Sequence, residues 1–337
     1  MKILITGATG FIGSHITAQA LMLGYDVTIG CRSSSSFSLL QSVLEYYSGN
    51  PDPEEKNRVD KLKAAMEPFK VSPSPLSEFN DFTPIALEIP EKLILDDWPF
   101  EEIKNKAFGA IIHCAAIVSF EKSMGYKMIE ENKQLTRDVV NTCVFGEIPN
   151  LLHISSIAAL GRPENDKPIS IKNQWVESRY NTDYAKSKYY SELEVWRGKE
   201  EGLNVLMLNP GVVLGFGLGN TSHKQVMDAV SPKNPFYPIG SNGFVFVEDV
   251  AHNALRLLSG SVFGNRHLLV SHNVPFKDLT EMIAQIKKIK SPHKPLVGFN
   301  FKTALKLARF CEFFRIPFPV SSELLISTHK KSVYVHQ

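Results

Sequence analysis

The first fifteen residues, MKILITGATGFIGSH, constrain the fold of this chain more than any other stretch. Residues 1–5 are rich in Ile and Leu, which is typical of a strand buried in a parallel sheet. An apolar stripe with helical spacing begins at Phe11. Between the two lies a turn with three glycines, Gly7, Gly10 and Gly13. Such a turn presents backbone N–H groups and a helix N-terminus to a pyrophosphate, so we expect dinucleotide binding rather than an ordinary glycine-rich turn.

The composition is typical of a soluble globular protein. The chain has 337 residues, of which 43% are hydrophobic and 21% are charged, and its net charge is +2. This composition allows a sizeable core, and the small net charge argues against a nucleic-acid surface. No apolar run reaches the roughly 18 residues of a membrane span, and the first strand leaves no room for a signal peptide. We therefore expect a cytoplasmic enzyme that binds neither nucleic acid nor membrane. Its four scattered cysteines are expected to be buried thiols, not metal ligands.

Apolar strand-like runs alternate with helical patterns along most of the chain. After the first strand, further strands are predicted at 26–30, 83–88, 110–114, 151–155 and 205–208. Helices are predicted over 37–47, 53–67, 125–144 and 182–201. This alternation predicts an α/β fold with a doubly wound parallel sheet of the Rossmann type. We assign residues 1–210 to this dinucleotide domain and residues 211–337 to a smaller substrate-binding region interleaved with it.

An insertion at 33–82 is long for a connection between neighbouring strands. It is expected either to form a flap over the adenosine half of the cofactor or to be a tolerated surface insertion. The strand predicted after it ends at Glu88. We expect this carboxylate to accept a hydrogen bond from the adenine amine.

The end of the second predicted strand faces the adenosine ribose. An NAD-preferring site often has an acidic residue there, whereas this chain has Cys31, Arg32 and Ser33. A guanidinium beside hydroxyl groups suits a ribose 2′-phosphate, which favours NADP (NADPH) over NAD. The alternative is an arginine that only lies at the surface.

Glycines and prolines interrupt the regular pattern beyond residue 210. Helices are predicted near 222–230, 247–259, 276–290 and 301–314, as a small cap on the carboxyl edge of the sheet. The last of these is apolar with interspersed lysine and arginine, which favours a wall of the substrate pocket over docking to a membrane surface. Five aromatic residues here either line a partly apolar substrate pocket or belong to the core: Phe216, Phe236, Tyr237, Phe244 and Phe246.

Catalytic chemistry is expected from Tyr184 and Lys188, in the sequence YAKSK, and from a serine pair at residues 155 and 156. Side chains four residues apart on a helix project from one face. A nearby ammonium stabilises a phenolate, so Lys188 is expected to lower the pKa of Tyr184 from its ordinary value of about 10. Tyr184 then exchanges a proton with a carbonyl or alcohol oxygen, and Ser155 or Ser156 hydrogen-bonds the same oxygen.

Taken together, these segments resemble the extended short-chain dehydrogenase/reductases of the epimerase/dehydratase superfamily. The matching segments are TGATGFIG (6–13), HCAA (113–116), ENKQLT (131–136), HISSIAALG (153–161), YAKSK (184–188) and NPGVVLG (209–215). Arg32, NPGVVLG and the segment 236–251 are most similar to the NADP-dependent dihydroflavonol-4-reductase-like enzymes. Sugar-nucleotide epimerases usually have an arginine in place of Asn209.

The resemblance implies roles for individual residues. The second serine of the pair, the tyrosine and the lysine form the catalytic set of that family, which implies Ser156, Tyr184 and Lys188 here. Asn132 corresponds to the helix asparagine that holds the active-site backbone and a proton-relay water. The residues expected to bind the cofactor are Gly7, Thr9, Gly10, Phe11, Ile12, Gly13, Arg32, Ser33, Glu88, Cys114, Ala115, Ala116, Ser155, Tyr184, Lys188, Pro210, Gly211 and Val213. The family also favours a homodimer built from paired helices near 125–145 and 182–200.

Some positions depart from the family pattern. Leu135 stands where a glycine is common and Glu88 where an aspartate is usual, and the long insertion resembles that of carrier-linked thioester reductases. We expect an NADP(H)-dependent oxidoreductase that reduces a ketone or aldehyde to an alcohol, with Tyr184 as general acid/base. The alternatives are an epimerase or dehydratase that reduces its cofactor transiently, a thioester reductase, and a non-catalytic dinucleotide-binding sensor.

Overall fold

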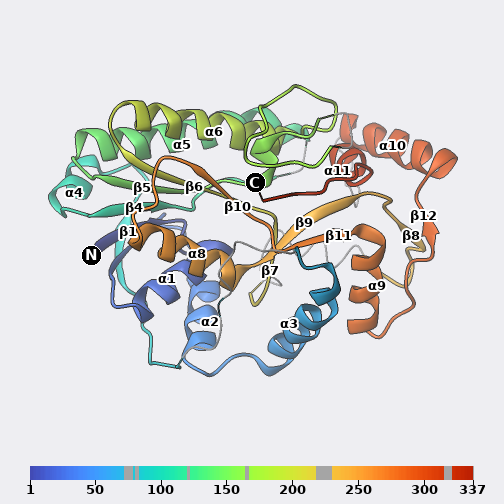
Figure 1. Ribbon diagram of the computed structural model, residues 1–337, viewed down its shortest axis with the longest axis horizontal. Helices are drawn as coiled ribbons and strands as arrows, with labels where there is room; N and C mark the ends of the chain where they lie inside the picture. Colours follow the sequence, from blue (N-terminus) through green and yellow to red (C-terminus); the bar gives the residue numbers. More distant parts are fainter. Residues whose placement is uncertain are drawn as a thin grey trace.

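Seven parallel strands form the central sheet in the computed structural model (Figure 1). The structure describes residues 1–71, 79, 83–119, 122–163, 167–217, 230–314 and 321–336. The strand order is β3-β2-β1-β4-β5-β6-β10. These strands are β1 (Lys2–Thr6), β2 (Asp26–Cys31), β3 (Glu91–Ile94), β4 (Ala110–His113), β5 (Asn150–Ile154), β6 (Asn204–Pro210) and β10 (Arg266–Leu269).

Helices cover both faces of this sheet, which explains why its inner strands are apolar throughout. Ile3 and Ile5 pack into one core cluster, whereas Leu4 between them packs into a second cluster on the opposite face. The first face carries α1 (Phe11–Met22), α2 (Ser38–Tyr47) and α8 (Val247–Ser259), and the second carries α4 (Phe100–Asn105), α5 (Gly125–Phe145) and α6 (Asp183–Glu200) (Figure 1). The predicted α/β fold with a doubly wound parallel sheet is thus confirmed.

The strand order reverses between β1 and β4, which pair side by side. In open α/β sheets this reversal leaves a crevice outside the carboxyl ends of the strands, where dinucleotides bind. The glycine-rich loop follows β1, and the HCAA segment ends β4. Both therefore lie at this crevice.

The insertion contributes α2 and α3 (Pro53–Met66) to the main core. Four of its side chains are fully buried: Leu40, Val43, Tyr47 and Met66. The ring of Tyr46 stacks on Phe216, with centroids 4.5 Å apart, and the Glu55 carboxylate accepts a hydrogen bond of 2.9 Å from the N–H of Gly217. The two helices therefore both contact the loop after β7 (Val212–Leu214). The interpretation of the insertion as a surface addition is wrong for α2 and α3. The flap over adenosine stays a prediction, since residues 72–78 and 80–82 lie outside the described part.

The third strand lies three residues beyond the predicted 83–88, at Glu91–Ile94. Residues 83–90 are irregular, and the N–H of Leu87 donates to Ser48 Oγ at the end of α2 (3.3 Å). Glu88 consequently precedes β3 and lies at the amino end of a parallel strand, away from the edge that holds the glycine-rich loop. The expected contact of Glu88 with adenine is therefore wrong.

Beyond residue 210 the chain builds two small sheets and returns to the large one through α8 and β10. A three-stranded sheet contains β7, β9 (Ser241–Phe246) and β11 (His272–Pro275), and a two-stranded one contains β8 (Phe236–Tyr237) and β12 (Lys294–Pro295). The helices α9 (Phe276–Ile286), α10 (Gly298–Phe313) and α11 (Ser322–Thr328) lie at the same end of the molecule (Figure 1). The helix predicted at 222–230 lies outside the described residues except for Val230. None of the described helices is both long enough and apolar enough to cross a membrane.

Three of the five aromatic residues proposed for the substrate pocket are buried in the core. Phe216, Phe244 and Phe246 are at most 5% exposed and belong to the main core cluster. Only Phe236 and Tyr237, on β8, are partly exposed. The aromatic content of this region therefore gives little support to an apolar substrate. All four cysteines are free thiols, as expected, and three of them are buried.

Candidate active site

The glycine-rich loop leaves its backbone open because side chains do not fit there. Gly7 has φ +72°, and a Cβ at this position would lie 2.6 Å from the backbone N of Ala115. The N–H of Gly10 donates to the carbonyl of Gly7 (2.9 Å), which closes the turn. A Cβ on Gly13 would collide with the same carbonyl. Helix α1 has neither a side-chain cap nor an acidic residue in its first turn, so its N-terminal N–H groups fit a pyrophosphate.

Replacing Gly7 with Ala is expected to destabilise the fold more than the same change at Gly24. Both glycines have nearly equal positive φ, +72° and +74°, but a Cβ at Gly24 meets nothing within 4 Å. Gly24→Ala should therefore cost only the backbone strain, about 1–2 kcal/mol. Gly7→Ala adds the collision with Ala115 and should also abolish dinucleotide binding. Denaturant unfolding and a dinucleotide titration of both variants check this, and equal losses would contradict the close approach of the loop to β4.

The side chains of the loop point in different directions. Phe11 is 7% exposed and packs edge-on against His15, so it offers only its backbone to a ligand. Thr9 and Ile12 are partly buried. On the neighbouring strand, the N–H of Cys114 donates to the carbonyl of Thr6 (3.1 Å). Cys114, Ala115 and Ala116 are all partly exposed at the crevice.

Arg32 and Ser33 are exposed immediately after β2, where the adenosine ribose is expected. The backbone N–H of Ser33 donates to both carboxylate oxygens of Asp96 (3.1 and 3.3 Å). Asp96 follows β3 at the carboxyl edge of the sheet, which is the position predicted for Glu88. The missed signal is the run KLIL followed by two aspartates, because an acid directly after a short apolar run marks a strand end.

The start of α6 brings Tyr184 to the end of β5. Thr182 caps this helix by accepting a hydrogen bond from the N–H of Ala185 (3.1 Å). The phenol of Tyr184 lies near enough to Ser156 for the serine hydroxyl to influence its pKa. Ser156 stands at the N-terminus of the short helix Ile157–Leu160. One turn further along α6, the Lys188 ammonium donates to the carbonyl of Ile154 (3.1 Å). The structure therefore brings together the three predicted catalytic residues.

Burial dominates the pKa values of this cluster. It raises the pKa of Tyr184, and the nearby hydroxyl of Ser156 opposes that shift. The expectation of a lowered Tyr184 pKa is therefore wrong, and the phenol is protonated at neutral pH. Burial also lowers the pKa of Lys188 to about 8, against the opposing effects of Cys114 and Glu192. A protonated phenol is the form required to donate a proton.

Asn132 joins the loop after β4 to α6. Its side-chain oxygen accepts from the N–H of Ile117 (2.7 Å), and its amide nitrogen donates to the carbonyl of the same residue (2.8 Å). The amide nitrogen also donates to Ser187 Oγ (3.3 Å), whose hydroxyl donates to the backbone carbonyl of Tyr184 (2.9 Å). Asn132 thus links the backbone of the loop after β4 to the first turn of α6.

The two serines at the end of β5 have different partners. Ser156 meets Tyr184, whereas Ser155 Oγ donates inward to the buried carboxylate of Glu192 (2.5 Å). Asn209 of β6 donates to the Ser156 carbonyl (2.9 Å) and to the same Glu192 oxygen (2.6 Å). The choice left open by the sequence therefore falls on Ser156 as the hydroxyl next to the phenol.

The residues after β6 connect the large sheet to the small one. Pro210 and Gly211 are buried, and the Gly211 N–H donates to the carbonyl of Leu269 on β10 (2.9 Å). A Cβ on Gly211 would lie 3.0 Å from the backbone N of Phe244. Val213 is 4% exposed and packs in the main core.

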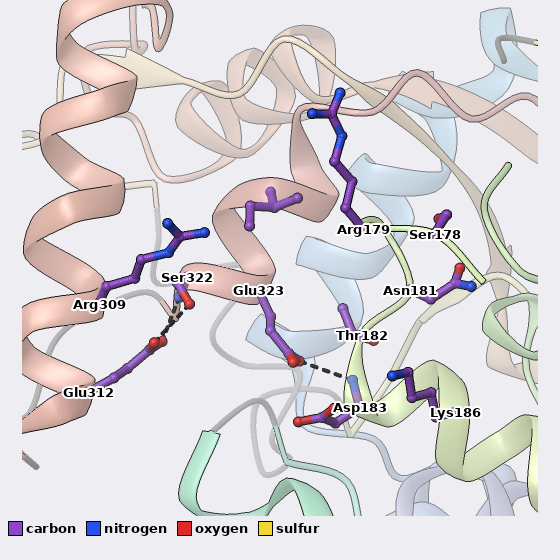
Figure 2. Close-up of a pocket in the computed structure, with 11 residues that line it drawn as sticks. Ser178, Arg179, Asn181, Thr182, Asp183, Lys186, Arg309, Glu312, Ser322 and Glu323 are labelled. Carbon is purple, nitrogen blue, oxygen red and sulfur yellow. Dashed lines mark hydrogen bonds between the residues drawn. The ribbon is translucent and has the colours of Figure 1, made fainter. Parts of the chain in front are cut away.

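A pocket of about 430 Å³ lies beside the start of α6 (Figure 2). The N–H of Asp183 donates to Glu323 (3.1 Å) across it, and Glu312 of α10 accepts from the hydroxyl of Ser322 (2.7 Å). Helix α10 forms one wall. The lining is mostly polar: Ser178, Arg179, Asn181, Thr182, Asp183, Lys186, Arg309, Glu312, Ser322, Glu323 and Ile326.

Comparisons with known proteins identify the family and agree with the fold. Residues 3–268 match the model of the NAD dependent epimerase/dehydratase family. The chain is 22% identical to cinnamoyl-CoA reductase CAD2 of Medicago truncatula, over 84% of this chain and 80% of the relative. It is 20% identical to dihydroflavonol 4-reductase of Arabidopsis thaliana, over 90% and 79%. A nucleoside-diphosphate-sugar epimerase from Pseudomonas aeruginosa has a similar fold, with a TM-score of 0.65, 18% identity, and coverage of 92% of this chain and 85% of that one.

Proposed function

Because the chain belongs to the NAD-dependent epimerase/dehydratase family, we propose that it is an NADP(H)-dependent oxidoreductase that reduces a ketone or aldehyde to an alcohol. The observation that carries this proposal is the position of the Tyr184 phenol beside Ser156 at the carboxyl edge of the sheet, with Lys188 one helical turn further along α6. The similarity to plant reductases supports this proposal.

In the proposed reaction, four side chains have separate roles. The dinucleotide, when bound, supplies the hydride. Ser156 hydrogen-bonds the carbonyl oxygen and orients it toward the phenol, and Tyr184 donates a proton to that oxygen as negative charge develops on it. Lys188, one helical turn after Tyr184, carries the positive charge that stabilises the phenolate left after proton transfer. Asn132 fixes the loop at Ile117 and the start of α6, so that these groups keep their relative positions.

We assign the pocket of Figure 2 to the part of the substrate distant from its carbonyl. Thr182, Asp183 and Lys186 line this pocket and flank Tyr184 on the same helical turn. The lining is polar, which favours a substrate with hydrogen-bonding groups at that end.

NADPH oxidation against a mixed panel of ketones, aldehydes and acyl thioesters tests the function. Net loss of NADPH absorbance with a ketone or aldehyde is the expected result. Net loss with acyl thioesters alone would identify a thioester reductase. Turnover of a sugar nucleotide without net change in absorbance would identify an epimerase or dehydratase, and tight NADPH binding without turnover of any substrate would identify a sensor.

Arg32→Asp is expected to reverse the cofactor preference. The guanidinium is exposed directly after β2 and is available to a 2′-phosphate, whereas an aspartate there would repel that phosphate and accept from a ribose hydroxyl. Loss of one charge-assisted contact should weaken NADPH binding by about 1.5–3 kcal/mol, or roughly 10- to 100-fold. Titrations of both proteins with NADPH and NADH measure the change. A wild-type preference for NADH would contradict the role given to Arg32.

A further inference from the structure

Glu192 is a fully buried carboxylate behind the catalytic cluster. Its side chain is 0% exposed, and it stands four residues after Lys188 and eight after Tyr184 on α6. Three residues at this spacing share one helix face. An isolated carboxylate at this depth would be costly to keep ionised, so its partners decide its state.

Four structural elements meet at this carboxylate. Glu192 itself lies on α6, and it accepts hydrogen bonds from Ser155 of the strand-end loop and Asn209 of β6. It also contacts Arg266 of β10, with 2.8 Å between Arg266 Nη2 and Glu192 Oε2. The Arg266 side chain is only 16% exposed. Two hydrogen-bond donors and a guanidinium stabilise the ionised form of a buried carboxylate.

We propose that Glu192 is a positioning residue of the active site, whose buried negative charge keeps Lys188 protonated while its contacts with Ser155 and Asn209 hold the backbone that carries Ser156. This inference rests on the proposed function, because it assigns Lys188 the role given above. Glu192 acts through Lys188 and the strand end and does not reach the substrate itself.

The other groups that face Lys188 are neutral near pH 7. Burial lowers the pKa of His113 to about 3 and that of His153 well below its ordinary value. Burial raises the pKa of the Cys114 thiol to about 12 and that of the Tyr184 phenol. Among the described groups that act on Lys188, Glu192 is therefore the one that carries a negative charge, and it opposes the fall of the Lys188 pKa caused by burial.

Glu192→Gln tests the proposal by removing the charge while keeping the shape and an oxygen acceptor. Loss of an opposite charge nearby should lower the pKa of Lys188 by about one unit, from about 8 to about 7. The alkaline limb of kcat/KM for NADPH-dependent reduction should then move down by about one pH unit. The loss should be about fivefold at pH 8 and smaller at pH 6.5. A pH-independent loss would show that Glu192 has only a structural role and would overturn the proposal.

A readout that needs no turnover separates this inference from the proposed function. The ammonium of Lys188 is titrated by NMR in protein labelled with ¹³C,¹⁵N-lysine, and its signal is identified by its loss in Lys188→Arg. A lower Lys188 pKa in Glu192→Gln supports the inference even if no carbonyl substrate is reduced. An unchanged Lys188 pKa refutes it even if the enzyme is a reductase.

Two further variants control for charge and folding. Glu194→Gln removes a carboxylate two residues away that pairs with Arg137 (3.3 Å) and Arg197 (3.0 Å), so it should leave the pH profile unchanged. If Glu192→Gln does not fold because Arg266 loses its partner, the double variant Glu192→Gln/Arg266→Gln removes both charges. It should still lower the Lys188 pKa, and an unchanged value in this variant would also overturn the proposal.

Discussion

Replacing Tyr184 with Phe is expected to lower kcat for carbonyl reduction by a factor of about 10²–10⁴, which is the usual contribution of a general acid. The change removes one hydroxyl, which lies beside Ser156. It leaves the Thr182 cap and the Ser187 contact of the helix in place, since both involve backbone atoms of α6. NADPH affinity should therefore stay nearly unchanged. Steady-state kinetics and an NADPH titration of the variant give the two measurements.

The kinetic pattern distinguishes loss of the acid from general damage. An interaction made only in the transition state lowers kcat and kcat/KM equally when it is removed. Tyr190→Phe is the matched control, because this tyrosine lies on the same helix and is 37% exposed. It should retain full turnover. If Tyr184→Phe also retains turnover, the phenol takes no part in the mechanism.

The fold was predictable where burial shows directly in the sequence. The inner strands are covered on both faces, so β1, β4 and β5 appear as continuous apolar runs close to their observed ends. β3 lies at the sheet edge and buries only Leu93. Its sequence EKLI therefore has no long apolar run, and the preceding TPIALE resembled a strand better. That segment contains Leu87, which packs partly against the main core without forming a strand.

Site residues were predictable where their spacing along one helix places the reactive side chains on the same face. Tyr184, Lys188 and Asn132 lie on helices whose periodicity fixes which side chains share a face. Asp96 and Glu192 were missed because their partners come from distant segments, Ser33 for the former and Ser155 and Arg266 for the latter. The predicted direction of the Tyr184 pKa shift was wrong for a related reason. Its largest cause is burial, which depends on the packed structure and not on the spacing of Tyr184 and Lys188.

Lys188→Met is expected to stabilise the protein by about 2 kcal/mol at pH 7 while it impairs turnover. Lys188 is 5% exposed, and burial lowers its pKa from 10.5 to about 8. The unfolded chain therefore binds the proton more tightly than the folded one, a difference of about 3 kcal/mol at pH 7. Methionine has a similar length and no charge to desolvate. It loses the hydrogen bond to the Ile154 carbonyl, which costs about 1 kcal/mol.

The pH dependence of this gain identifies its cause. Between about pH 8 and 10.5 the folded protein holds fewer protons at Lys188 than the unfolded chain, so wild-type stability rises with pH across this window. The advantage of Lys188→Met should therefore shrink toward pH 10.5. Denaturant unfolding at pH 7 and pH 10 measures it, with Lys186→Met as the control, since that side chain is 35% exposed and should show no gain.

A gain that persists unchanged at pH 10 would mean that packing, not charge, explains it. A gain that disappears would show that the fold tolerates a buried ammonium at a cost in free energy of unfolding. Stabilising substitutions commonly cost activity where the active site itself needs a destabilising group. Opposite effects of Lys188→Met on stability and on turnover would therefore place the requirement for this charge in the chemistry at Tyr184.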